Sequence, residues 1–236
     1  MNLSDSQKEA VCHGQGPLLV TAGAGSGKTR TLTERVIYLI NSKVDPERIV
    51  AITFTNKAAD EMRKRILEGV HRTGKKKLPY IGTFHAFGAR ILRKEAKSLT
   101  RNHGFSIFDD DDSLRVIKKS VKSLGLPENI KISSALFLKD ISNAKMELLT
   151  SDSLESPVRE VFLDYEVRLK EQNAFDFDDL ITKVVELLSA NPVKLKKYQD
   201  QFDHILVDEY QDINHAQYVL IKLLSKEHGN LNVVGD

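Results

Sequence analysis

Residues 18–29 read Leu18-Leu19-Val20-Thr21-Ala22-Gly23-Ala24-Gly25-Ser26-Gly27-Lys28-Thr29. They are the clearest indication of the fold of this 236-residue chain. An apolar run leads into a glycine-rich turn, and a helical pattern follows. This is the strand–loop–helix order of a phosphate-binding loop. Glycines let the backbone approach a polyphosphate and turn its N–H groups toward the oxygens. A helix that begins near Gly27 would add the positive end of its dipole, so the stretch predicts a site for nucleotide phosphates.

Lys28 and Thr29 are the candidate functional side chains of this loop. Lys28 can reach the β- and γ-phosphates of a nucleotide, and the Thr29 hydroxyl can ligate Mg²⁺. The general pattern begins with glycine, whereas Ala22 stands at its first position here. A flexible glycine-rich turn before a helix is therefore the alternative reading of the loop taken alone. A second half of the site, further along the chain, argues against that alternative.

The second half is Ile205-Leu206-Val207-Asp208-Glu209. The residues from His204 to Val207 read as a buried parallel strand, and two carboxylates follow it at the end where α/β sheets bind ligands. Asp208 would hold Mg²⁺, directly or through water, and Glu209 would polarise the water that attacks the γ-phosphate. An acidic helix cap is the alternative, which the pairing with the phosphate loop disfavours.

Composition narrows the class of protein. The chain is 41% hydrophobic and 29% charged, which suits a globular protein with one or two domains. No run of about 18 apolar residues occurs, so no membrane helix is expected, and the N-terminus lacks a signal-peptide pattern. Cys12 is the single cysteine, so an intrachain disulfide or a cysteine-based zinc site is excluded. We expect a cytoplasmic protein without a membrane partner.

Charge is unevenly distributed although the net charge is only +2. Asp60 to Arg101 holds twelve Lys or Arg against four acids, a net +8, and Ser151 to Ile181 holds nine acids against three bases, a net −6. The basic block is a candidate face for a polyanion such as DNA. Solvated helix surface is the alternative for most of its lysines.

The order of elements predicts a parallel α/β sheet that is interrupted by a helical insert. Ser4-Asp5-Ser6-Gln7 is a capping box for a short first helix, so Gln7 either closes that cap or faces a nucleotide base. The expected strands are 18–21, 49–54, 80–83, 204–208 and 231–234, and the helices between them are 31–40, 57–68, 84–96 and 216–224. The stretch from Phe108 to about Leu188 is helical with almost no strand signal. We therefore assign 1–88 and 190–236 to an ATP-binding domain and 89–189 to an all-helical insert.

Several motifs together resemble the superfamily 1 DNA helicases of the UvrD, Rep and PcrA type. The family's adenine-reading motif resembles residues 3–7, and its form of the phosphate loop, with alanine first, resembles residues 22–29. Its two DNA-contact motifs resemble Ile52-Thr53-Phe54-Thr55-Asn56-Lys57-Ala58-Ala59 and Gly82-Thr83-Phe84-His85-Ala86. Phe177-Asp178-Asp179-Leu180 and Asp208-Glu209-Tyr210-Gln211-Asp212, with Asn214 and Gln217, match two further segments. The similarity runs along the whole chain.

The resemblance implies a RecA-like phosphate-loop NTPase, part of a motor that uses ATP and Mg²⁺ to move 3′ to 5′ along single-stranded DNA in repair or replication. The implied nucleotide-binding residues are Gln7 for adenine and Ala22, Gly23, Ala24, Gly25, Ser26, Gly27, Lys28, Thr29 and Arg30 around the phosphates. The implied catalytic residues are Lys28, Asp208, Glu209 and Gln211, and the implied metal ligands are Thr29 and Asp208. Gln211 would couple the γ-phosphate to DNA. The implied DNA path is lined by Phe54, Asn56, Thr83 and His85, where Phe54 can stack a base. A core position for Phe54 and a helix-start role for His85 stay open as alternatives.

The final residues, 233–236, look like the opening of a family motif that senses the γ-phosphate. We therefore expect a first motor domain with its insert, whose partner is the second motor domain of a longer protein. Such a half would bind ATP but hydrolyse it slowly. A small phosphate-loop kinase, the helicase part of a recombination nuclease–helicase, and a nucleotide-binding module without turnover remain alternatives. A kinase would need a mobile lid, and the long separation of Lys28 from Asp208 argues against it.

Overall fold

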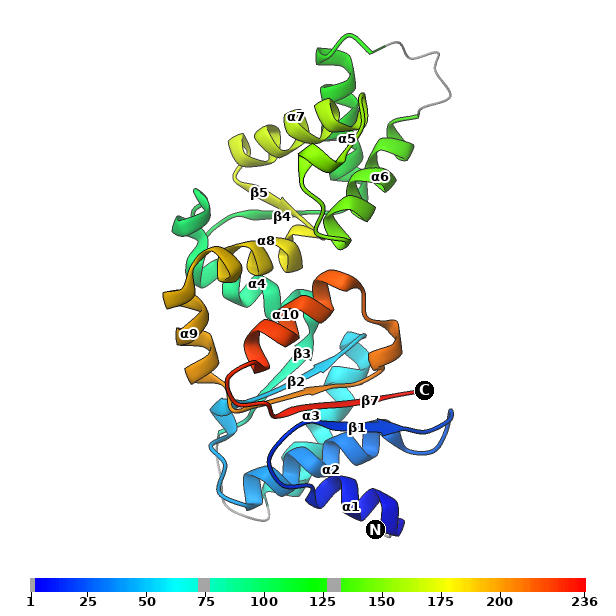
Figure 1. Ribbon diagram of the computed structural model, residues 1–236, viewed down its shortest axis with the longest axis vertical. Helices are drawn as coiled ribbons and strands as arrows, with labels where there is room; N and C mark the ends of the chain where they lie inside the picture. Colours follow the sequence, from blue (N-terminus) through cyan, green and yellow to red (C-terminus); the bar gives the residue numbers. More distant parts are fainter. Residues whose placement is uncertain (1–2, 72–76, 127–132) are drawn as a thin grey trace. The chain divides into compact units, whose positions relative to one another are not determined.

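The computed structural model describes residues 3–71, 77–126 and 133–236, and the chain forms two compact units (Figure 1). The sheet unit comprises Met1–Phe84, Asn191–Ile213 and Tyr218–Asp236. The insert unit comprises His85–Ala190 and Asn214–Gln217. The domain boundaries expected from the sequence stay a prediction. Three members of the basic block, Arg72, Lys75 and Lys76, lie outside the described residues.

Five parallel strands form the sheet, in the order β1-β7-β6-β2-β3. They are β1 (Leu18–Thr21), β2 (Ile49–Thr53), β3 (Tyr80–Thr83), β6 (His204–Val207) and β7 (Leu231–Gly235). Every residue of β2 and β6 is buried, as expected for parallel strands covered on both faces. The expected parallel α/β sheet is confirmed. Its carboxyl edge brings together the residues that follow β1, β6 and β7.

The sheet unit also contains helices, some of which pack an apolar stripe against the sheet. They are α1 (Asp5–Cys12), α2 (Lys28–Asn41), α3 (Asn56–His71), α9 (Pro192–Gln201) and most of α10 (His215–Ser225), with short 3₁₀ turns η1 (Pro46–Arg48) and η4 (Tyr210–Asp212). In one core cluster, Leu32 and Val36 of α2 and Met62 and Ile66 of α3 pack with Ala51 of β2. The capping box before α1 is present as predicted.

The insert unit is mainly helical but not all-helical, which corrects the expectation. Its helices are α4 (Phe84–Glu95), which begins in the sheet unit, η2 (Ala96–Leu99), α5 (Asp110–Ser123), α6 (Ser134–Met146), η3 (Ser151–Ser153), α7 (Val158–Glu171) and α8 (Asp179–Ala190). Two strands, β4 (Ser106–Phe108) and β5 (Ala174–Asp176), pair in parallel as a separate sheet. Three residues are too few to display the alternation that identifies a strand, so sequence periodicity could not reveal them.

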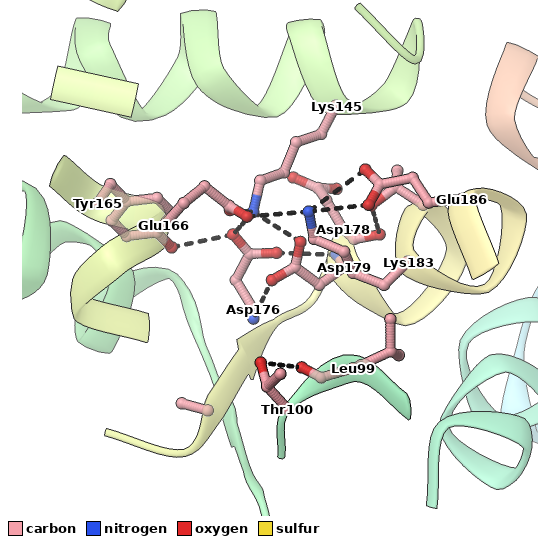
Figure 2. A network of polar contacts seen from close by, with 12 residues as sticks. Leu99, Thr100, Lys145, Tyr165, Glu166, Asp176, Asp178, Asp179, Lys183 and Glu186 are labelled. Atoms are coloured by element: carbon pink, nitrogen blue, oxygen red, sulfur yellow. Dashed lines mark hydrogen bonds and ion pairs between the residues drawn. The ribbon is translucent and has the colours of Figure 1, made fainter. Parts of the chain in front are cut away.

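A buried network of charges holds the insert unit together (Figure 2). The Nζ of Lys145 lies 2.7 Å from Glu166 Oε1, 2.7 Å from Asp176 Oδ2 and 2.8 Å from Asp179 Oδ1. Tyr165 donates a hydrogen bond of 2.9 Å to Asp176 Oδ2. The network therefore joins α6, α7, β5 and α8.

Among the described residues, no helix has the length and apolar character needed to cross a membrane.

Candidate nucleotide site

The phosphate loop lies between β1 and α2 and is fixed by backbone contacts. The N–H of Ala22 donates to the carbonyl of Gly235 on β7, at 3.1 Å. Gly27 is the N-cap of α2 and has a φ of 89°, a left-handed conformation that glycine tolerates. A Cβ at Gly27 would lie 3.2 Å from Nε2 of Gln7, so the space there also favours glycine. Gly27 offers no side-chain cap, and the first N–H groups of α2 therefore suit an anion.

Lys28 is buried, at 8% exposure, and its ammonium faces the loop. Its Nζ donates to the carbonyl of Ala22 at 2.7 Å and forms an ion pair with Asp236. The hydrogen bond with Asp236 raises the pKa of Lys28, so the side chain carries a positive charge at neutral pH. A charged ammonium held beside the loop is what a nucleotide polyphosphate requires.

Thr29 and Asp208 meet although they are far apart in the sequence. The Thr29 hydroxyl donates to Asp208 Oδ2 at 2.7 Å, and the N–H of Asp208 donates to the carbonyl of Ile52 at 2.9 Å. Asp208 is only 2% exposed, and this burial raises the pKa of its carboxyl group. A hydroxyl beside a buried carboxylate is an oxygen donor set that fits Mg²⁺.

Glu209 and Gln211 lie in the segment that follows β6, directly after Asp208. Glu209 has a φ of 50°, which is uncommon for a residue other than glycine. Gln211 donates to Glu209 Oε2 at 2.9 Å, and its Oε1 accepts the N–H of Asp236 at 3.2 Å. The Gln211 amide thus connects the Glu209 carboxylate to the end of β7.

Gln7 and Arg30 border the loop. Gln7 Oε1 accepts the N–H of Ser4 at 2.9 Å, and Gln7 Nε2 donates to the carbonyl of Ser26 at 3.0 Å. The side chain therefore closes the cap and also contacts the phosphate loop, while base recognition stays a prediction. Arg30 is half-buried, and its buried Nε has no hydrogen-bond partner in the described parts of the chain. This buried donor is available to a ligand bound at the loop.

The residues predicted to line a DNA path belong to different units. Phe54, Asn56 and Thr83 follow or end the neighbouring strands β2 and β3 in the sheet unit. Phe54 is half-buried and packs against Phe84, with ring centroids 6.2 Å apart. This contact partly supports the alternative that Phe54 belongs to the core. Asn56 is exposed at the start of α3. The role of these residues in DNA binding stays a prediction.

His85 lies in the insert unit, near the start of α4, where its ring stacks on Phe177 at a centroid distance of 3.8 Å. Burial lowers the pKa of His85 to about 4, so the imidazole is neutral at pH 7. An electrostatic attraction of His85 to phosphate is therefore not expected at neutral pH. A neutral ring could contact DNA through stacking or hydrogen bonds.

Sequence reasoning missed the pairing of Lys28 with Asp236 and the stacking of His85 on Phe177. The first could have been found from strand order, because β7 pairs directly with β1 and its carboxyl end must lie beside the loop. No local signal indicates the second, since the two rings are distant in the sequence.

The chain is similar to known proteins along its length. The family model of the UvrD/REP helicase N-terminal domain matches residues 3–236. A relative from Staphylococcus epidermidis, named ATP-dependent DNA helicase PcrA, is 42% identical over 100% of this chain and 33% of its own length. Proteins of the same name from Staphylococcus aureus and Leuconostoc citreum are 42% and 40% identical. The chain thus spans about a third of the length of these relatives. Its phosphate loop, the strand-end carboxylates and the match over nearly every residue place this chain in the family of UvrD/REP helicase N-terminal domains.

Proposed function

We propose that this chain is the ATP-binding part of an ATP-dependent DNA helicase that moves 3′ to 5′ along single-stranded DNA. The observation that carries the proposal is the 2.7 Å hydrogen bond from Thr29 to Asp208, which joins the phosphate loop to the carboxylates after β6. The names of the relatives support the same activity. A helicase of this kind would act in the cytoplasm, in DNA repair or replication.

Each residue has a chemical role in this proposal. Lys28 and the N–H groups at the start of α2 bind the β- and γ-phosphates. Mg²⁺ would be held by Thr29 and Asp208 and would neutralise charge on the phosphates. Glu209 accepts a proton from the attacking water, and Gln211 orients the Glu209 carboxylate through the hydrogen bond between them.

The rest of a longer motor would complete the site. An arginine supplied from another domain is worth about 10³–10⁵ in the rate of phosphoryl transfer. We propose that a second motor domain, in the part of the relatives that this chain does not span, supplies such groups. The 236-residue chain alone should then bind ATP, hydrolyse it slowly and unwind no duplex.

Calorimetry with ATP and a steady-state ATPase assay test the proposal. The wild-type chain should bind ATP in a Mg²⁺-dependent manner, Asp208→Asn should lose most of that dependence, and Glu209→Gln should bind as well as wild type. Rapid DNA-stimulated hydrolysis by the chain alone, absent in Glu209→Gln, would contradict the proposed need for a second domain. Failure of the wild-type chain to bind ATP would contradict the nucleotide assignment itself.

Fluorescence anisotropy with labelled oligonucleotides tests the DNA part of the proposal. Binding should be weak, independent of sequence and reduced by salt, because it depends on phosphate contacts. Phe54→Ala should weaken it if this ring stacks on a base. An affinity that does not change between about 50 and 200 mM salt would contradict this part of the proposal.

A further inference from the structure

Arg35 is a buried arginine for which the nucleotide site described above gives no role. It lies on α2 and is only 1% exposed. Its guanidinium donates only to neutral acceptors, namely Asn232 Oδ1 at 2.5 Å and the carbonyls of Val11 at 2.9 Å, His13 at 2.8 Å and Gly14 at 3.2 Å. No carboxylate pairs with it in the described parts of the chain. A buried cation without a counter-ion is costly, so its four contacts must accomplish something that an apolar side chain cannot.

Three of those contacts hold the end of α1. The last carbonyls of a helix have no partner within the helix, and a cation there also interacts favourably with the helix dipole. α1 has eight residues, of which only Ala10 and Val11 are buried. A helix this short is not stable alone, and two small apolar side chains anchor it weakly. The Arg35 guanidinium is therefore a major attachment of α1 to the sheet unit.

The opposite end of α1 carries Gln7, which reaches the phosphate loop. Gln7 donates to the carbonyl of Ser26, one residue before Gly27. Arg35 also donates to Asn232 on β7, and the residue that follows this strand, Asp236, pairs with Lys28. One guanidinium thus ties α1, α2 and β7 together, and each of these elements delivers a residue to the loop.

We propose that Arg35 is a positioning residue for base recognition: by clamping the end of α1 to α2 and β7, it holds Gln7 against the phosphate loop at the place where the base of a bound nucleotide is read. This inference rests on the proposed nucleotide function and extends it from the phosphates to the base. A lysine cannot replace Arg35, because one ammonium cannot reproduce the planar set of donors that reaches Asn232 and three carbonyls.

Competition binding with ATP, GTP and inorganic tripolyphosphate, each with Mg²⁺, tests the proposal on the 236-residue chain. Arg35→Lys should lower the preference for ATP over GTP by about tenfold, the value of one or two hydrogen bonds, and change tripolyphosphate affinity by less than about twofold. Gln7→Ala should have the same effect. The double variant should lose no more preference than Gln7→Ala alone, because Arg35 acts through Gln7.

Two further measurements separate positioning from general damage. Hydrogen exchange should show α1 amides opening faster in Arg35→Lys while those of α2 and the sheet stay protected. Arg101 is a matched control, because it is an arginine of the insert unit that donates to the carbonyls of Ala174 and Leu99. Arg101→Lys should leave the nucleotide preference unchanged. If Arg35→Lys fails to fold, Arg35→Gln, which keeps two donors, replaces it.

The outcomes distinguish the proposed nucleotide function from the role of Arg35. A wild-type chain that binds no ATP, or binds ATP and GTP equally, would overturn the proposed base recognition together with this inference. A wild-type chain that prefers ATP, with an Arg35→Lys variant that keeps the preference or loses tripolyphosphate to the same extent, would overturn the role of Arg35 alone. Additive losses in the double variant would also contradict it.

Discussion

Two buried lysines in this molecule have different surroundings. Lys145 of the insert unit is surrounded by Glu166, Asp176 and Asp179, all within 2.8 Å of its Nζ. Lys28 of the sheet unit contacts one backbone carbonyl and the half-exposed Asp236. Figure 2 shows the first arrangement, in which the carboxylates converge on the ammonium from several elements.

The difference separates a structural site from a binding site. A buried charge that is fully surrounded by partners has no donor left for a ligand, so the Lys145 network serves to join the elements of the insert. The phosphate loop instead keeps hydrogen-bond donors available: among the residues that the structure describes, the buried Nε of Arg30 has no partner, and the partner of Lys28 is half exposed. Uncapped N–H groups at the start of α2 and a lysine whose partner is half exposed are therefore what the proposed nucleotide site has and the Lys145 network lacks.

The largest effect is expected at Lys145. Replacing it in Lys145→Met leaves three buried carboxylates without their shared cation and should lower the free energy of unfolding by about 3–5 kcal/mol. Urea denaturation followed by circular dichroism measures this loss. Lys139→Met on the same helix removes an exposed lysine and should change stability by less than about 0.5 kcal/mol. Equal losses in the two variants would show that the buried Lys145 contributes no more to stability than the exposed Lys139.

Lys28→Met should show the reverse pattern. ATP affinity should fall by about 10–100-fold, because charge-assisted hydrogen bonds to the phosphates are lost. Without nucleotide, the free energy of unfolding should change by less than about 1 kcal/mol, since the partner Asp236 is half exposed and can be solvated. Calorimetry and urea denaturation of the same sample provide both values. Destabilisation as large as that of Lys145→Met would show that Lys28 is also structural.

Two carboxyl groups of the network differ in their pKa. Burial and Asp176 raise the pKa of Asp179 to about 8, whereas Lys145 and Lys183, against the effect of burial, lower the pKa of Glu166 to about 2. Asp179 is therefore the carboxyl group of the two that takes up a proton more readily near neutral pH. Asp179→Asn should stay within about 1 kcal/mol of wild type at pH 7, and Glu166→Gln should cost about 2–3 kcal/mol.

The pH dependence follows from the same shifts. The native Asp179 carboxyl keeps a proton that the unfolded chain, with a pKa near 3.8, has released. Wild-type stability should therefore decrease as pH rises from 6 toward 8, and this contribution should be absent in Asp179→Asn. Urea denaturation at pH 6, 7 and 8 measures it. Parallel pH profiles for the two proteins would show that Asp179 is ionised in the native state.

The smallest effect is expected for an exposed ion pair. Arg65 and Glu61 pair on α3 with about half of each side chain exposed. Arg65→Ala should change the free energy of unfolding by less than about 0.5 kcal/mol, because water already solvates both charges. A loss above 1 kcal/mol in urea denaturation would mean that pairing, rather than burial, determines the value of these contacts.

Much of the sheet unit could be predicted from the sequence. Its five strands have strong apolar signals, and the phosphate loop and the Asp208 carboxylate carry chemistry that requires them to meet. The capping box at Ser4 was predicted from four adjacent residues. These features could be predicted because each signal is local or because the parallel sheet places the strand ends on a single edge.

The remaining features depend on contacts between distant segments. Lys145 and Asp179 look like ordinary surface charges in the sequence, and only the packing of α6 against β5 and α8 buries them together. From the sequence, an arginine in a helix such as α2 is expected to face solvent, so the burial of Arg35 could not be predicted. β4 and β5 are so short that pairing with one another, rather than their own composition, defines them as strands.

The position of β7 in the strand order has a mechanical consequence. β7 lies between β1 and β6, so its carboxyl end touches both halves of the site: Gly235 accepts from Ala22, and Asp236 contacts Lys28 and Gln211. If the strand slid lengthwise by one residue, about 3.3 Å, all three contacts would break together. The axial position of β7 is therefore fixed by contacts with the phosphate loop and with the segment that follows β6, and a shift of the strand would disturb both together.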